Sequence, residues 1–193
     1  GADIIDIGGE STRPGYEKVS VEEELERVIP VIEALSKEVQ VPLSVDTYNA
    51  EVMRKSLQAG AHIINDIWGA KADPEMAKVA AEFDAPIILM HNRDNREYQF
   101  FYRDVLNDLF ESIQIVKNAG VKDEKIILDP GIGFAKDLSE NLEMMRHLDK
   151  LVSTGYPVLL GTSRKTMIGS VLNLPVNERM EGTGATVCYG IQK

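Results

Sequence analysis

Polar side chains end several apolar runs in this chain, and their types suit the binding of a polar small molecule. Asp46, Asn65 and Asp129 each follow such a run, and another run leads into Ser163 and Lys165. Carboxylates and amides form strong hydrogen bonds where water is scarce, and a lysine there binds an anion or a carbonyl oxygen. These residues predict a binding site assembled from the ends of several strands.

Six short apolar runs predict buried strands, because runs of this kind are typical of parallel sheets covered on both faces. They occupy residues 4–7, 43–45, 63–64, 86–90, 126–128 and 158–160. Helical periodicity between them predicts helices over residues 21–38, 49–59, 74–83, 103–118, 138–152 and 184–192. Ser20, with Glu23 three residues later, has the spacing of a helix N-cap.

Strict alternation of strand and helix predicts an α/β fold with a parallel sheet, either an open doubly wound sheet or a closed barrel. In both folds the chemistry gathers at the carboxyl ends of the strands. A (β/α)8 barrel usually takes about 250 residues, so a chain of 193 residues is short by roughly two units. We predict a single TIM-type (β/α)8 barrel domain over residues 1–193, with six of eight units visible and both ends truncated.

The composition narrows the possible partners. A net charge of −10 argues against nucleic acid, which requires a basic surface. Cys188 is the single cysteine, which excludes an internal disulfide and a cysteine zinc site and fits a reducing cytoplasm. No apolar run approaches the roughly 20 residues that span a bilayer, so we expect no membrane partner. The three histidines are not clustered, and a histidine metal site is not expected.

Five loop sequences, in chain order, closely resemble those of dihydropteroate synthase, especially the Bacillus-type bacterial enzymes. They are GGESTRPG at residues 8–15, SVDT at 44–47, IND at 64–66, LDPGIGF at 128–134 and GTSRK at 161–165. The family's Asn-x-Thr-Pro-Asp-Ser-Phe segment on the first strand and its Arg-x-His-Asp tip on the eighth have no counterpart here. These are the two units that the length argument finds missing.

The resemblance implies a transferase of folate biosynthesis and a sulfonamide target. It condenses 6-hydroxymethyl-7,8-dihydropterin diphosphate with 4-aminobenzoate to give 7,8-dihydropteroate and diphosphate. Lys165 and Asp46 would be catalytic. The implied pterin-binding residues are Asp46, Asn65, Met90, Asp129, Gly161 and Lys165. The implied diphosphate- and aminobenzoate-binding residues are Thr12, Arg13, Pro14, Phe134 and Ser163.

Mg²⁺ is the implied cofactor, but the family's Mg²⁺-binding Asn lies in the missing first strand, so no metal ligand is expected in this chain. The resemblance also implies a cytoplasmic homodimer that pairs through its last helices. Without the first and eighth strands, we expect weak or no turnover by these 193 residues alone. His91 ends an apolar run, but the reaction needs no strong base, so we do not expect it to act as one.

Two other functions fit parts of the sequence. A methyltetrahydrofolate methyltransferase-like barrel also binds pterins through carboxylates, but it has no reason to carry GGESTRPG and GTSRK. A non-catalytic barrel fragment would keep the fold without turnover. Single residues also have simpler interpretations: Asp129 before Pro-Gly suits a turn, Lys165 a solvated surface and Phe134 a core.

Overall fold

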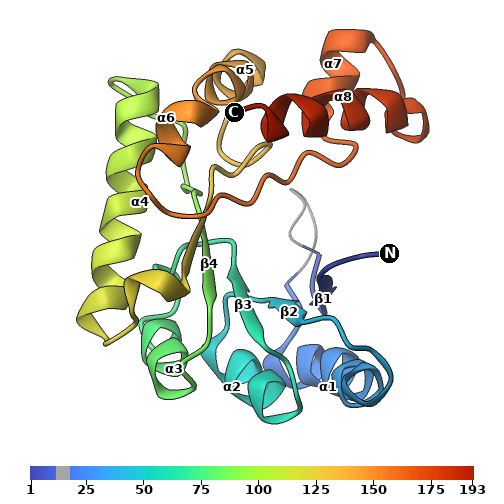
Figure 1. Cartoon of the computed structure of the whole chain (residues 1–193), viewed down its shortest axis with the longest axis vertical. Coiled ribbons are helices and arrows are strands. Elements are labelled where there is room, and N and C mark those ends of the chain that lie inside the picture. The colour runs from blue at the N-terminus through green and yellow to red at the C-terminus, as the bar shows by residue number, and fades with distance from the viewer. Residues whose placement is uncertain (12–17) are drawn as a thin grey trace. The chain divides into compact units, whose positions relative to one another are not determined.

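The computed structural model describes residues 1–11 and 18–193, and its framework is a five-stranded sheet. Four of its strands are labelled in Figure 1. The strands are β1 Ile5–Gly8, β2 Leu43–Asp46, β3 Ile63–Asp66, β4 Ile87–Met90 and β5 Ile126–Asp129. Their order in the sheet is β1-β2-β3-β4-β5, and the pairs from β1 to β4 are parallel. An order that never reverses is that of a barrel, whereas a doubly wound sheet reverses at its switch point.

Each strand is followed by a helix, and the last strand is followed by four α-helices among the described residues. They are α1 Val21–Glu38, α2 Ala50–Gln58, α3 Met76–Glu82, α4 Phe101–Asn118, α5 Leu138–Arg146, α6 Leu148–Val152, α7 Thr166–Leu172 and α8 Met180–Ile191. Short 3-10 turns cover Asp123–Lys125 and Val176–Glu178. None of the helices in the described part of the chain is long and apolar enough to cross a membrane.

The described chain divides into two compact units, each with its own apolar core. Unit 1 comprises Gly1–Leu89 and Ser112–Ile126, and unit 2 comprises Met90–Glu111 and Ile127–Lys193. Fully buried core residues of unit 1 include Ile32, Leu43, Val45, Met53, Ile64, Met76 and Ile87. Those of unit 2 include Leu109, Leu128, Ile132, Met144, Leu148 and Leu151, each at most 2% exposed.

Local signals explain where most helices begin and end. Ser20 caps α1, because its Oγ accepts a hydrogen bond from the backbone N–H of Glu23, as its spacing predicts. Asp137 and Glu140 form a capping box at the start of α5. Gly60 and Gly120 follow α2 and α4 with φ of +113° and +106°, backbone angles that favour glycine over residues with a Cβ.

Three segments differ from the sequence prediction. Residues 158–160 form no strand, and Val158 makes an isolated parallel bridge to Leu128. The helix predicted over residues 138–152 is divided, because His147 leaves the helical region at φ −104° and ψ 17°. Helix α7 was not predicted, since its seven residues are too few for a clear period and no side chain caps its start.

Gly9 tests how tightly α1 packs against the residues that follow β1. A Cβ at Gly9 would lie 2.9 Å from Glu24 Cγ and 2.9 Å from Val28 Cγ1, both on α1. We therefore expect Gly9→Ala to lower the free energy of unfolding by about 1–3 kcal/mol through overpacking, measured by urea denaturation.

The matched control is Gly184→Ala in α8. An added Cβ there meets nothing within 4 Å. The same substitution should raise stability by about 0.5–1 kcal/mol, because alanine is the better helix former. Equal effects of the two substitutions would contradict this account of α1 packing.

Candidate active site

Asp129 is the buried carboxylate at the carboxyl end of β5, and only 6% of its surface is exposed. Its Oδ1 accepts a hydrogen bond of 2.7 Å from the backbone N–H of Gly131. Burial raises the pKa of Asp129 to about 6, and the Gly131 hydrogen bond with the charges of Lys165 and Lys136 opposes this rise. The group is therefore mostly ionised at pH 7.

Glycines shape the loop that follows Asp129. Gly131 has a φ of +67°, and a Cβ there would lie 2.0 Å from the carbonyl oxygen of His91. Gly133 has a φ of +86°, and its Cβ would lie 3.1 Å from Lys165 Cδ. A side chain at either position would be strained and would displace a neighbour. Lys165 approaches this loop because Gly133 has no side chain.

Lys165 and Phe134 lie against each other in unit 2. The Nζ of Lys165 is 4.4 Å from the centroid of the Phe134 ring, which is a cation–π contact. Gly161 lies next to Asp129, because a Cβ added at Gly161 would lie 3.8 Å from Asp129 Oδ2. Gly161 therefore places no side chain against this carboxylate oxygen.

A second polar cluster in unit 2 surrounds His91, which is 2% exposed. Its backbone N–H donates to the carbonyl of Asp129 at 2.9 Å, and its Nε2 lies 2.9 Å from Asp108 Oδ2. Arg93 Nε donates to the same oxygen at 2.6 Å. Burial lowers the pKa of His91 to about 4, so its ring is neutral at pH 7. Burial opposes ionisation of Asp108, but the hydrogen bonds from His91 and Arg93 outweigh it and hold its pKa well below the usual range.

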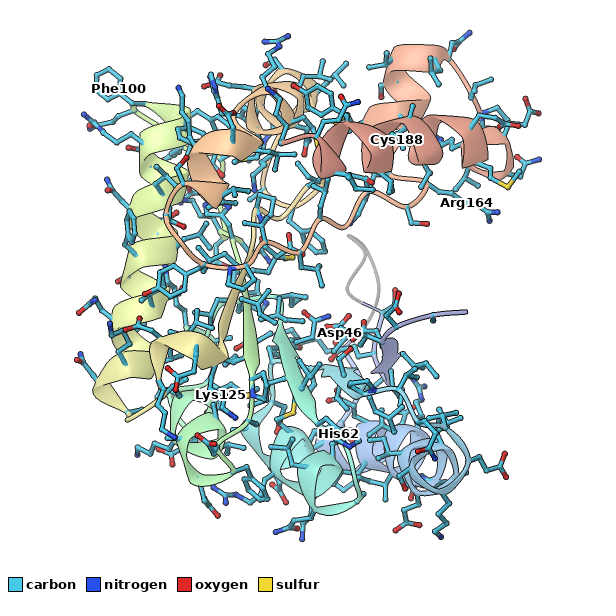
Figure 2. The ribbon with its side chains drawn as sticks, viewed as in Figure 1. Asp46, His62, Phe100, Lys125, Arg164 and Cys188 are labelled. Carbon is cyan, nitrogen blue, oxygen red and sulfur yellow. The ribbon has the colours of Figure 1, made fainter. Side chains whose placement is uncertain are left out.

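Unit 1 carries its own group of polar residues at strand ends. Asp46, which is labelled in Figure 2, ends β2. Asn65 lies on β3 and is its partner in the parallel register. Asn65 Nδ2 donates to both carboxylate oxygens of Asp6 at 3.3 Å, and Ser44 Oγ donates to Asp6 Oδ1. Asp6, which the sequence prediction did not name as a site residue, is therefore a hydrogen-bond partner of Asn65.

Comparisons with known proteins identify the family. The family model for pterin binding enzymes matches residues 1–193. The chain is 63% identical to the dihydropteroate synthase of Bacillus subtilis over 193 residues, which are 100% of this chain and 68% of that protein. The chain belongs to the dihydropteroate synthase family. The family predicted from the loop sequences is confirmed.

Solved dihydropteroate synthases have the same fold. The Clostridium difficile enzyme, crystallised in the presence of pteroic acid, matches with a TM-score of 0.97 at 48% identity, over 100% of this chain and 73% of that one. The Xanthomonas albilineans enzyme with 4-aminobenzoic acid matches with a TM-score of 0.96 at 41% identity, over 100% and 71%. The α/β, (β/α)8-type fold predicted from the sequence is therefore confirmed.

The structure brings together four of the residues that the dihydropteroate synthase resemblance implies. Asp129, Phe134, Gly161 and Lys165 lie around one another in unit 2. Met90, at the end of β4, is buried in the same unit, and Ser163 is exposed. Thr12, Arg13 and Pro14 lie outside the described residues.

Lys136 and Asp108 are residues that the sequence prediction missed. Lys136 is 8% exposed and lies 2.8 Å from His91 Nδ1. A lysine or aspartate in a polar stretch usually indicates solvent exposure, so the sequence carries no local sign of this burial. The position of His91 directly after an apolar run was the one available signal.

The raised pKa of Asp129 predicts a pH-dependent stability. The folded chain holds a proton on Asp129 below about pH 6, whereas the unfolded chain loses it near 3.8. The contribution of Asp129 to stability therefore falls as pH rises from about 4 to about 6, by up to about 3 kcal/mol. Asp129→Asn removes this contribution.

The measurement is the free energy of unfolding of wild type and Asp129→Asn by urea denaturation between pH 4 and 8. The variant should gain stability relative to wild type as pH rises from about 4 to about 6. A difference that does not change with pH would show that Asp129 has an ordinary pKa.

Proposed function

We propose that this member of the dihydropteroate synthase family condenses 6-hydroxymethyl-7,8-dihydropterin diphosphate with 4-aminobenzoate, giving 7,8-dihydropteroate and diphosphate in folate biosynthesis. The identity of 63% to the Bacillus subtilis enzyme over the whole chain supports this reaction. Relatives solved with pteroic acid and with 4-aminobenzoic acid support the two substrates. Sulfonamides, which resemble 4-aminobenzoate, belong to the same proposal as inhibitors.

The buried carboxylate of Asp129 is the observation that carries the assignment. A pterin ring presents adjacent N–H donors, and an ionised carboxylate accepts two parallel hydrogen bonds from such an edge. Gly131 occupies one lone pair of Oδ1, and Gly161 leaves the side of Oδ2 without a side chain. Asp129 therefore binds the pterin edge and fixes the orientation of the ring.

Lys165 supplies the cation of the site. In this proposal its ammonium group binds the pterin carbonyl oxygen, while the ring of Phe134 forms a wall for aminobenzoate. Their cation–π contact of 4.4 Å fixes the lysine relative to that wall. Ser163, which is exposed, is assigned to aminobenzoate, and Met90 packs near the pterin.

The reaction breaks the carbon–oxygen bond to diphosphate, and the bonding electrons leave with the diphosphate. The pterin methylene carbon becomes cationic and is captured by the amine of aminobenzoate, which then loses a proton. The chain's residues act by positioning the two rings in a site of preorganised charge. No strong base is needed, and His91 does not supply one, because its pKa is about 4 and both ring nitrogens have partners.

The remaining assignments rest on the resemblance. Asp46, as a second catalytic and pterin-binding group, and Asn65 stay predictions, supported by their paired positions at strand ends in unit 1. The assignment of Thr12, Arg13 and Pro14 to diphosphate and aminobenzoate also stays a prediction.

Mg²⁺ belongs to the proposal as the cofactor that the family implies. Among the described residues, no three or more His, Cys, Asp or Glu side chains are grouped so as to hold a metal ion. Mg²⁺ commonly binds through one or two carboxylates, substrate phosphates and water, so the described residues do not form a complete protein site. When bound, it would supply positive charge to the departing diphosphate, and no role assigned above depends on it.

A cytoplasmic homodimer completes the proposal. Support for a second copy comes from exposed apolar side chains near the carboxyl end of the chain. They are Val171, Leu172, Val176, Met180, Val187 and Ile191. The cytoplasm is favoured by Cys188 as the single cysteine.

Binding of pteroic acid tests the pterin assignment. Calorimetric titration should show binding to wild type that weakens as pH falls below about 6, because Asp129 then becomes protonated. Asp129→Asn replaces a charged acceptor with a neutral amide, and we expect its affinity to fall about 100-fold or more.

Asp66→Asn is the matched control. Asp66 is also fully buried and its pKa is also raised to about 6 by burial, but its oxygens accept from the backbone N–H groups of Trp68 and Ala70 at 2.8 Å. The affinity of the Asp66→Asn variant for pteroic acid should equal that of wild type. Equal losses in both variants would contradict the role of Asp129, and binding without turnover would favour the non-catalytic alternative.

Sedimentation equilibrium tests the homodimer. Wild type should sediment as two copies of the chain. Ile191→Asp should shift it toward one copy, because Ile191 is 80% exposed in the single chain and a charge would oppose its burial at an interface. A monomeric wild type at high concentration would contradict the homodimer.

A further inference from the structure

Lys136 is a buried lysine in unit 2 with three hydrogen-bond acceptors around its Nζ. Burial lowers the pKa of Lys136 to about 7 and the charge of Asp129 opposes this fall, so Lys136 is mostly charged near pH 6, where Asp129 titrates. Its Nζ lies 2.8 Å from His91 Nδ1, 3.0 Å from the carbonyl oxygen of Gly131 and 3.1 Å from that of Phe134. An ammonium group has three N–H donors, and three acceptors match them. All donors of Lys136 are therefore used inside the protein.

This arrangement defines the state of the neighbouring groups. Because His91 Nδ1 accepts from Lys136, the ring proton is on Nε2, which donates to Asp108 Oδ2 at 2.9 Å. Arg93 binds both oxygens of Asp108, at 2.6 and 3.2 Å. The groups follow one another in the order Lys136, neutral His91, anionic Asp108 and cationic Arg93. No charged group in this order therefore bonds directly to a group of like charge.

The two carbonyl acceptors of Lys136 belong to residues that form the proposed ligand site. Gly131 donates its N–H to Asp129 Oδ1 at 2.7 Å, and Phe134 carries the ring that contacts Lys165. Tyr98 OH also donates to the carbonyl of Ala135 at 2.8 Å, which holds the same loop from another side. Through Gly131 and Phe134, Lys136 is connected to the carboxylate and to the aromatic wall.

We infer that Lys136 is a positioning residue, which acts through Gly131 to orient and charge-stabilise the pterin-binding Asp129 and through Phe134 to fix the aminobenzoate wall. This inference rests on the proposed function of the site. Lys136 does not touch the ligand, because its donors are saturated and it is 8% exposed. Its effect reaches the ligand through Asp129 and Phe134.

Lys136→Met tests the inference, because methionine has a side chain of similar length but lacks the charge and the N–H donors of lysine. We expect the affinity for pteroic acid to fall about tenfold or more. The pH midpoint below which binding is lost should rise by about half a pH unit or more, because Asp129 then keeps only Lys165 as a facing cation. The charged groups facing Lys136 are Asp129, Glu140, Asp108 and Arg93, with neutral His91.

The pH midpoint separates positioning from a general loss of structure, since a merely destabilised chain binds less without a change in the midpoint. Lys125→Met is the matched control. Lys125, which is labelled in Figure 2, has a side chain that is 27% exposed, and its Nζ lies 3.1 Å from Asp84 Oδ2 in unit 1. Lys125→Met should leave both affinity and midpoint unchanged. Where Lys136→Met does not fold, Lys136→Gln replaces it, because the amide still donates hydrogen bonds without the charge.

The outcomes separate the two levels of the argument. An unchanged midpoint in a folded Lys136 variant, with or without weaker binding, would overturn the role of Lys136 while leaving the proposed function intact. If wild type does not bind pteroic acid at all, the proposed function itself is wrong. Weaker binding with a raised midpoint, absent from the Lys125 control, supports the inference.

Discussion

Asp129 is ionised inside the protein, and a buried carboxylate persists only where hydrogen bonds and opposite charges replace its lost hydration. Gly131 supplies the hydrogen bond, and Lys165 and Lys136 supply the charge. The hydrogen bond requires the loop to turn back at Gly131, where φ is +67° and no Cβ can be accommodated. The glycine of the DPG sequence, which begins at the last residue of β5, thus allows the hydrogen bond that stabilises the charge of Asp129.

Each cation that stabilises Asp129 creates a further requirement. The three N–H donors of buried Lys136 need hydrogen-bond acceptors. The acceptors are the carbonyl oxygens of Gly131 and Phe134 and the Nδ1 of His91. The single N–H of the neutral ring is then on Nε2 and donates to Asp108, which in turn accepts from Arg93. The series ends at Arg93 and Asp108, whose side chains are 23% and 20% exposed and so reach water. One internal carboxylate therefore determines the residues along a path to the surface.

The sequence predicted features that depend on neighbours in the chain. The bounds of α1, the cap at Ser20 and the turns at Gly60 and Gly120 follow from local patterns of burial and capping. The positions of Asp129 and Lys165 after apolar runs also follow, because parallel strands present their carboxyl ends at one edge.

The features it did not predict depend on contacts between distant segments. Lys136 meets His91 across 45 residues, and Asp108 meets it across 17, so neither burial is visible in a local pattern. Residues 158–160 have the composition of a strand but pair with Leu128 at a single bridge, which local propensity does not determine. The missed side chains contact the loop that follows Asp129, whereas the predicted ones are those that we propose bind the ligand.

The two lysines near Asp129 show why both kinds of residue are needed. A single cation that both balanced the carboxylate and bound the substrate would have to exchange partners when the ligand arrived, and the carboxylate would lose stabilisation at that moment. Lys136 is buried with its Nζ bonded to three acceptors inside the protein, so its position does not depend on the ligand. Lys165 is half-buried against Phe134 and can respond to the ligand instead. Separating the two tasks keeps the site organised before the substrate binds, which is the condition for electrostatic catalysis without reorganisation.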